Sequence, residues 1–99
     1  MWYAIWTEYH PDSLPLRLTH RPAHLARLHQ LRDAGRLMLA GPLPALDQED
    51  PGEAGYTGSL IVADFTNLEE AQSWLNAEPY LLHGVYAKAT VKPFRKTLP

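Results

Sequence analysis

The clearest periodic pattern of apolar positions lies in residues 19–35, where Leu25, Leu28 and Leu31 recur at helical spacing. This stripe predicts an amphipathic helix that packs its leucine face on a core. His24 lies four residues before Leu28 and seven before Leu31, so it points to the edge of the buried face rather than to water. Because an imidazole titrates near neutral pH, this position is the most chemically suggestive in the chain.

Signals at both ends give the predicted boundaries of this helix. Thr19 can accept a backbone N–H bond at the N-terminus, and Pro22 falls in the first turn, where its missing N–H costs little. Gly35 suits the left-handed residue that ends many helices. Residues 12–15, Asp-Ser-Leu-Pro, are therefore expected to form a loop that leads to the helix.

Residues 2–9 are rich in aromatic and β-forming side chains and precede a turn signal, which predicts a strand. Alternation divides them into one face with Trp2, Ala4 and Trp6 and another with Tyr3, Ile5, Thr7 and Tyr9. Both faces are largely apolar or aromatic, so both should be covered. Apolar runs predict further strands at residues 37–40, 59–65 and 85–94, the last with one solvated face.

A second helix is predicted from residue 68 to about residue 77. Asn67, with Glu70 three residues later, resembles a capping box, and Pro79 disfavours a helical conformation at the residue before it. The order strand–helix–strand–strand–helix–strand predicts an α+β fold of the ferredoxin-like plan, with an antiparallel four-stranded sheet and both helices on one face.

The opposite face of that sheet has no predicted element left to cover it. Because residues 2–9 are rich in aromatic side chains, leaving that face exposed to water is unfavourable. The simplest cover is a second copy of the chain. We therefore expect a homodimer with the two sheets face to face and a cleft in or beside the interface. Whether dimers associate further is left open.

Composition narrows the possible functions. The chain has 99 residues, 45% of them hydrophobic, which fits one globular domain over residues 1–99. A formal charge of -2 with scattered basic residues disfavours nucleic-acid binding. The absence of cysteine removes thiolate metal sites and thiol nucleophiles. No signal peptide or membrane-spanning run occurs, so a cytoplasmic protein is expected.

Residues 42–57 form a long irregular stretch rich in proline, glycine and acidic side chains. A connection of this length in a small domain is often a functional loop. Two interpretations remain open, a lid over a site and a plain acidic hairpin tip.

A metal site is the first chemical possibility to weigh. His20 and His24 are four residues apart, a spacing that can hold a metal. However, a catalytic zinc site also needs a third ligand, and residues 21–23 read Arg-Pro-Ala instead of the glutamate-containing centre of a zinc-protease motif. No phosphate loop or calcium loop occurs either. We therefore expect no metal and no cofactor.

General acid–base chemistry at His24 is the second possibility. A catalytic imidazole needs a carboxylate on its other ring nitrogen, and Asp12, Asp64 and Glu78 are the candidates. The sequence does not choose among them, because the partner would be adjacent only in space. The alternative is a histidine at the core edge that bonds to the backbone.

Several short motifs occur in an order that is typical of one family. They are Arg21-Pro22-Ala23-His24-Leu25-Ala26-Arg27-Leu28, Gly35-Arg36-Leu37, Ala40-Gly41-Pro42, Asp50-Pro51-Gly52, Thr57-Gly58-Ser59, Pro79-Tyr80, Gly84-Val85-Tyr86 and Val91-Lys92-Pro93-Phe94. The chain resembles the YciI-like (YCII-related) family from the first strand to the last. The resemblance implies a ferredoxin-like fold assembled as a dimeric α/β barrel, with a cleft that holds a histidine–aspartate dyad. One relative eliminates chloride from a chlorinated hydroxyquinol, and related barrels include muconolactone isomerases.

The resemblance also implies which residues form the site. The family histidine corresponds to His24, whereas the family Asp-Pro-Tyr motif reads Glu78-Pro79-Tyr80 here, so the carboxylate has one more methylene. The implied catalytic residues are His24 and Glu78. If the protein is an enzyme, we expect its substrate cleft to be lined by Ser13, Gly41, Pro42, Ser59 and Tyr80.

The sequence leaves three functions open. As an enzyme, the protein would use His24 to move a proton on a small cyclic or aromatic substrate, leading to isomerisation or elimination. As a ligand-binding or sensor protein, it would bind an aromatic molecule by stacking on Trp and Tyr side chains. A purely structural interaction module has only the acidic loop in its favour.

Overall fold

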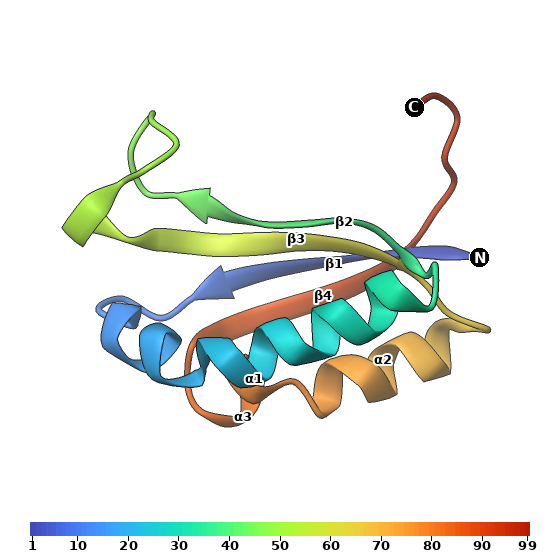
Figure 1. Cartoon of the computed structure of the whole chain (residues 1–99), viewed down its shortest axis with the longest axis horizontal. Helices are drawn as coiled ribbons and strands as arrows, with labels where there is room; N and C mark the ends of the chain where they lie inside the picture. Colours follow the sequence, from blue (N-terminus) through green and yellow to red (C-terminus); the bar gives the residue numbers. More distant parts are fainter.

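The computed structural model describes all residues from 1 to 99, in the order β1, α1, β2, β3, α2, α3 and β4 (Figure 1). The strands are β1 (Trp2–Tyr9), β2 (Leu37–Pro44), β3 (Tyr56–Asp64) and β4 (Tyr86–Phe94). The helices are α1 (Leu14–Asp33), α2 (Leu68–Asn76) and α3 (Pro79–Leu82), and a short 3-10 turn covers Gly52–Ala54. The predicted alternation of strands and helices is confirmed.

All four strands form one antiparallel sheet in the order β2-β3-β1-β4, so β1 lies between β3 and β4. The three helices lie together on one face of this sheet (Figure 1). This arrangement is the predicted α+β fold of the ferredoxin-like plan.

The two faces of β1 follow the predicted alternation. Tyr3, Ile5, Thr7 and Tyr9 are buried beneath the helices, whereas the residues between them are more exposed. The register places Ile5 beside Ile61 of β3 and Val91 of β4. The core is completed from the helices by Leu28, Leu31, Ala71, Leu75 and Tyr80. The sheet therefore provides a rigid floor for the inner face of α1.

Helix α1 begins earlier than predicted, at Leu14 instead of Thr19. Pro15 is the proline of the first turn, and Pro22 lies inside the helix. The hydroxyl of Thr19 donates to the Pro15 carbonyl one turn back, at 3.1 Å, as interior threonines do. The prediction was wrong because a first-turn proline signal does not say which of two prolines occupies that turn. The expected loop at residues 12–15 is correspondingly shorter.

Two predicted helix caps are confirmed. Gly35 follows the end of α1 with a left-handed φ of 69°. At the start of α2, the Asn67 side chain accepts a hydrogen bond from the Glu70 backbone N–H at 2.8 Å. The Glu70 carboxylate in turn accepts from the Thr66 backbone N–H at 2.8 Å, one residue earlier than a standard capping box.

Strand β2 continues through Gly41 and Pro42 to Pro44, although the prediction ended it at Ala40. Because β2 is an edge strand, one side of it forms no ladder, and proline is tolerated there. Strand β3 also begins earlier than predicted, at Tyr56. The predicted irregular stretch of residues 42–57 was therefore too long at both ends.

The face of the sheet that points away from the helices carries exposed apolar side chains. Trp6 is 49% exposed, Leu39 44% and Phe94 38%. All three helices lie against the opposite face of the sheet (Figure 1). None of the helices is both long and apolar enough to cross a lipid bilayer.

Candidate functional site

Helix α1 places His24 in the line of Leu28 and Leu31 on the face that meets the sheet. The residue is 8% exposed, so it lies at the edge of the core, as the spacing predicts. Its imidazole stacks on the ring of Tyr80, with the ring centroids 4.0 Å apart and the planes 14° from parallel. The ring is therefore held flat against the core.

A buried carboxylate meets the inner nitrogen of this ring. Glu78 ends the turn after α2 in an extended conformation, because Pro79 begins α3 directly after it. Its side chain is fully buried, and its Oε1 is hydrogen-bonded to His24 Nδ1. Of the three candidate acids, Asp64 pairs with the N-terminal amine at 2.7 Å, and Asp12 lies in a left-handed turn beside another hollow.

The second oxygen of Glu78 is engaged by Arg27, which the sequence reasoning did not include. Arg27 Nη1 lies 2.5 Å from Glu78 Oε2, and Nη2 donates to the Trp74 carbonyl at 2.8 Å. The guanidinium also stacks over the Trp74 ring at 4.2 Å. A signal was present, because residues 24 and 27 are three apart on one helix and share a face. Both carboxylate oxygens are thus occupied.

Tyr80 lies behind the imidazole. It is fully buried, and its hydroxyl donates to the Arg17 carbonyl at 3.3 Å. Burial raises the pKa of Tyr80 to about 12, so the phenol is neutral at physiological pH. Tyr80 was expected to line a substrate cleft, but it is not among the residues that line the hollow beside His24, because its ring packs against the imidazole.

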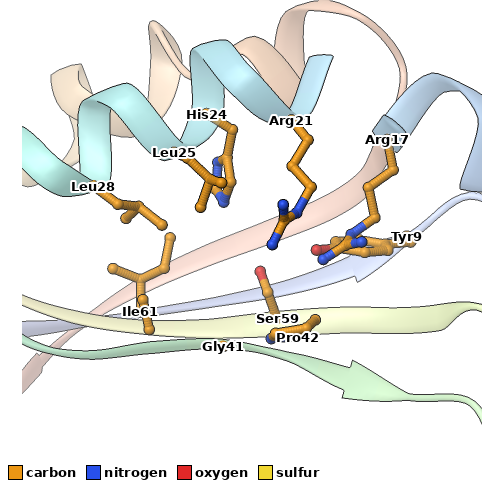
Figure 2. Close-up of a pocket in the computed structure, with 11 residues that line it drawn as sticks. Tyr9, Arg17, Arg21, His24, Leu25, Leu28, Gly41, Pro42, Ser59 and Ile61 are labelled. Carbon is orange, nitrogen blue, oxygen red and sulfur yellow. The ribbon is translucent and has the colours of Figure 1, made fainter. Parts of the chain in front are cut away.

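The outer side of His24 faces a hollow of about 160 Å³ between α1 and the sheet (Figure 2). Gly41, Pro42 and Ser59, all expected at the cleft, line its floor on β2 and β3. The helix side of the hollow is lined by Arg17, Arg21, His24, Leu25 and Leu28. The Ser59 hydroxyl is 2.6 Å from the Thr7 hydroxyl and makes no bond to His24, so no serine–histidine pair exists.

Ser13 does not line this hollow. It borders a neighbouring one of about 280 Å³, formed by residues 9–14 and parts of the connection between β2 and β3. The serine is separated from His24 because α1 begins directly after it and extends away by almost three turns before His24. Of residues 45–55, Ala45 and residues 53–55 border this second hollow and none borders the first, so this part of the chain does not cover His24 as a lid.

His20 and His24, the two histidines four residues apart, contact different aromatic rings and do not converge on one point. His20 stacks on His83, with ring centroids 4.0 Å apart and planes 1° from parallel. No group of three or more metal-binding side chains occurs in the chain.

Two arginines that were not predicted from the sequence also lie at the site. Arg17 and Arg21 share the face of α1 that carries His24, and they line the hollow with it.

Comparison with known proteins places these residues in a family. The YCII-related domain matches residues 1–95. The chain belongs to the YCII-related family. Protein YciI of Escherichia coli is 55% identical over 96 residues, which cover 97% of this chain and 98% of that protein. A protein of Haemophilus influenzae is 50% identical over 96 residues, with the same coverage of both chains.

Among solved structures, one neighbour is a 5-chloro-2-hydroxyhydroquinone dehydrochlorinase from Burkholderia phenoliruptrix, in complex with 2,5-dihydroxybenzoquinone. It matches with a TM-score of 0.84 and 24% identity, over 96% of this chain and 94% of that chain. At this identity the likeness establishes the shared fold.

Proposed function

We propose that this protein is a small-molecule enzyme in which His24 transfers a proton and Glu78 orients the imidazole. One observation carries the proposal: the buried Glu78 carboxylate engages Nδ1 of a ring that also lines a hollow. The structural neighbour named as a dehydrochlorinase supports a reaction of this class, in which a proton and a leaving group depart.

Hydrogen bonding assigns the roles of the two ring nitrogens. An ionised carboxylate can only accept, so Nδ1 carries the hydrogen that faces Glu78. Nε2 then presents its lone pair and has no partner in the chain. Arg27 on the second oxygen of Glu78 keeps the carboxylate paired and prevents it from rotating away. His24 is thereby oriented as a general base, and Glu78 stabilises the imidazolium that forms.

The reaction begins at a carbon next to a carbonyl group. The C–H bond breaks, the proton moves to His24 Nε2, and the electron pair moves onto the carbonyl oxygen to form an enolate. In an isomerisation, the imidazolium returns the proton to a different carbon. In an elimination, the carbonyl re-forms, a carbon–carbon double bond forms, and halide leaves from the next carbon. The proton on His24 then passes to water.

The test uses deuterium exchange, because abstraction of a carbon-bound proton is visible even without net turnover. The wild-type protein is incubated in D2O with small cyclic ketones and with 5-chloro-2-hydroxyhydroquinone, and NMR and chloride release are followed. We expect activity to fall by about 10² or more in His24→Ala and in Glu78→Gln. The matched control is His29→Ala, an exposed histidine on the same helix.

Exchange and chloride release that persist unchanged in both variants would remove the proposal. A compound that binds and raises the melting temperature but is neither exchanged nor consumed would select the alternative, a ligand-binding protein. The contact between His24 and Glu78 favours the enzyme, since a stacking pocket for an aromatic ligand does not require a charged partner behind the imidazole.

We also propose that two copies pack sheet to sheet. Exposed Trp6, Leu39 and Phe94 share the face that no helix covers, and such a patch is unusual in a monomer. In light scattering after size exclusion, we expect a dimer that Trp6→Glu converts to a monomer. Leu18→Glu, an exposed leucine on the helix side, is the control. A wild-type monomer would contradict the proposal.

A further inference from the structure

Two arginines stand beside His24 at the wall of the hollow. Residues 17, 21 and 24 are four and three positions apart, so α1 presents all three side chains on one face. Figure 2 shows Arg17 and Arg21 extending from α1 toward the sheet, with the Ser59 hydroxyl pointing toward Arg21. This end of the hollow is therefore cationic.

Neither arginine has an acidic partner. The arginine ion pairs of the chain involve Arg27, Arg32 and Arg36, but not Arg17 or Arg21. No Asp or Glu lines the hollow, and the buried carboxylate behind the imidazole already uses both oxygens. Two positive charges thus face the same space without compensation.

The need for a bound acceptor is clearer for Arg17 than for Arg21, because Arg17 is only 9% exposed. Its Nε is buried and has no hydrogen-bond partner, while its guanidinium lies over the Tyr56 ring at 4.2 Å from the centroid. A buried donor without an acceptor costs free energy, and more so when the group is charged. Such a group is satisfied if a bound molecule brings an acceptor.

The other end of the hollow is apolar. Leu25 and Leu28 from α1 face Ile61 of β3 there, and His24 lies between this end and the arginines (Figure 2). The hollow measures about 160 Å³. An apolar cavity of about 150 Å³ in another protein accommodates benzene. The apolar end together with the cationic end therefore suits one ring that carries one charged group.

We propose that the substrate is a single-ring molecule with an oxyanion, a carboxylate or a phenolate, that Arg17 and Arg21 bind. This substrate class rests on the proton-transfer function proposed above. The guanidinium fork matches two oxygens of a carboxylate and also bonds a single phenolate oxygen. With the oxyanion at the arginines and the ring against Leu28, a ring carbon lies under His24. The arginines thus set substrate class and orientation, while His24 moves the proton.

Calorimetric titration of the full chain tests this assignment with four probes. Benzoate and a nitrophenolate, at a pH where it is ionised, represent the two oxyanions. Benzamide has nearly the shape of benzoate without the charge, and acetate has the charge without the ring. Arg21→Gln is the main variant, because Arg21 is exposed and its replacement leaves the core intact. Arg17→Lys keeps a charge but loses the fork.

We expect at least one oxyanion to bind, and to bind about tenfold or more weakly to Arg21→Gln and to Arg17→Lys. Arg32→Gln, which removes an exposed positive charge from the same helix, should bind like the wild type. Benzamide and acetate should bind more weakly than benzoate by a similar factor. The relative affinity for benzoate and the nitrophenolate distinguishes a carboxylate from a phenolate substrate.

Three results would overturn the assignment: no binding of either oxyanion, equal binding by wild type and both arginine variants, or equal affinity for benzamide and benzoate. Binding of these probes needs no proton transfer, so the titrations are repeated with His24→Ala. If the dependence on Arg21 persists while no carbon acid is exchanged by the wild type, the proton-transfer function fails and the anion site stands.

Discussion

Two glutamates at opposite ends of α2 each pair with an arginine, but in different surroundings. Glu70 lies in the first turn at the surface, where it accepts from the Thr66 N–H and pairs with Arg36 at 3.0 Å. Glu78 lies after the last turn, fully buried, between His24 and Arg27. The first is the carboxylate that a helix N-terminus favours. The second has no such role in forming the helix.

The difference in burial between Glu70 and Glu78 indicates which of the two carboxylates has a function beyond stability. A buried ion pair loses the hydration of both partners, and well-packed apolar residues would often stabilise the fold as well or better. Stability is therefore a poor reason for a charged cluster beneath α1. The cluster lies beside the hollow that His24 lines, which is where an oriented imidazole would act. We expect changes at Glu78 to affect both stability and activity, and changes at Glu70 to affect stability alone.

The largest effect is expected from Glu78→Ala. It removes the fully buried carboxylate between Arg27 and His24 and leaves the part-buried Arg27 guanidinium without its partner, which costs about 3 to 5 kcal/mol. Urea unfolding followed by circular dichroism measures the loss. Glu70→Ala is the control, and its free energy of unfolding should fall clearly less. Equal falls in the two variants would show that the difference in burial has no effect on stability.

The next effect is expected from the arginines of the two pairs. Arg27→Gln leaves one oxygen of the buried Glu78 carboxylate without its charged donor, so we expect a loss of about 1.5 to 3 kcal/mol. Arg36 is part-exposed, and water can replace its bond to Glu70, so Arg36→Gln should lose less stability. Thermal unfolding of both variants measures which one is destabilised more. A larger loss of stability in Arg36→Gln would contradict this prediction.

A smaller effect on stability is expected at alkaline pH from Tyr80, which is buried beside Glu78 and His24. Burial raises the pKa of Tyr80 to about 12, above the value of about 10 of an unfolded chain. The folded state then holds the proton more tightly, so this stability is present below pH 10 and is lost as pH rises toward 12. Tyr80→Phe should flatten that decline in urea unfolding at a series of pH values. An unchanged decline in Tyr80→Phe would contradict this.

The smallest effect is expected at acid pH on the exposed side. Hydrogen bonds from Thr66, together with Arg36, lower the pKa of the Glu70 carboxyl. The folded state favours the ionised form, so this stability is present above about pH 4.5 and is lost as pH falls below it. Glu70→Gln should lack this part of the acid decline. A decline of the same steepness in the variant would remove Glu70 as its source.

Much of the scaffold could be predicted, because it depends on neighbours in sequence. The two faces of β1 and the caps at Gly35 and Asn67 follow from spacing and from local hydrogen bonds. Errors arose where local signals conflict with tertiary context. The start of α1 was displaced because two prolines could open it, and β2 was cut short because its place at the sheet edge was unknown.

The site was predictable only in part. The position of His24 at the core edge followed from the helical stripe, but three acids remained possible partners until the chain was folded. Arg17, Arg21 and Arg27 were missed, although their spacing from His24 places them on the same side of α1. Ser13 and Tyr80 were assigned to a cleft that neither lines, because sequence shows that a residue is near a site but not which way it faces.

By itself, the sequence determined the kinds of elements, their order, the alternating faces of β1 and the apolar face of α1, because these depend on a periodicity of two or of about 3.6 residues. The tertiary structure alone decided that the carboxylate of Glu78 meets the imidazole of His24, 54 residues away along the chain. It also decided that Arg17 and Arg21 line a hollow that contains no Asp or Glu side chain. Such contacts depend on how α1 and the turn before α3 pack together, and no local rule contains that geometry.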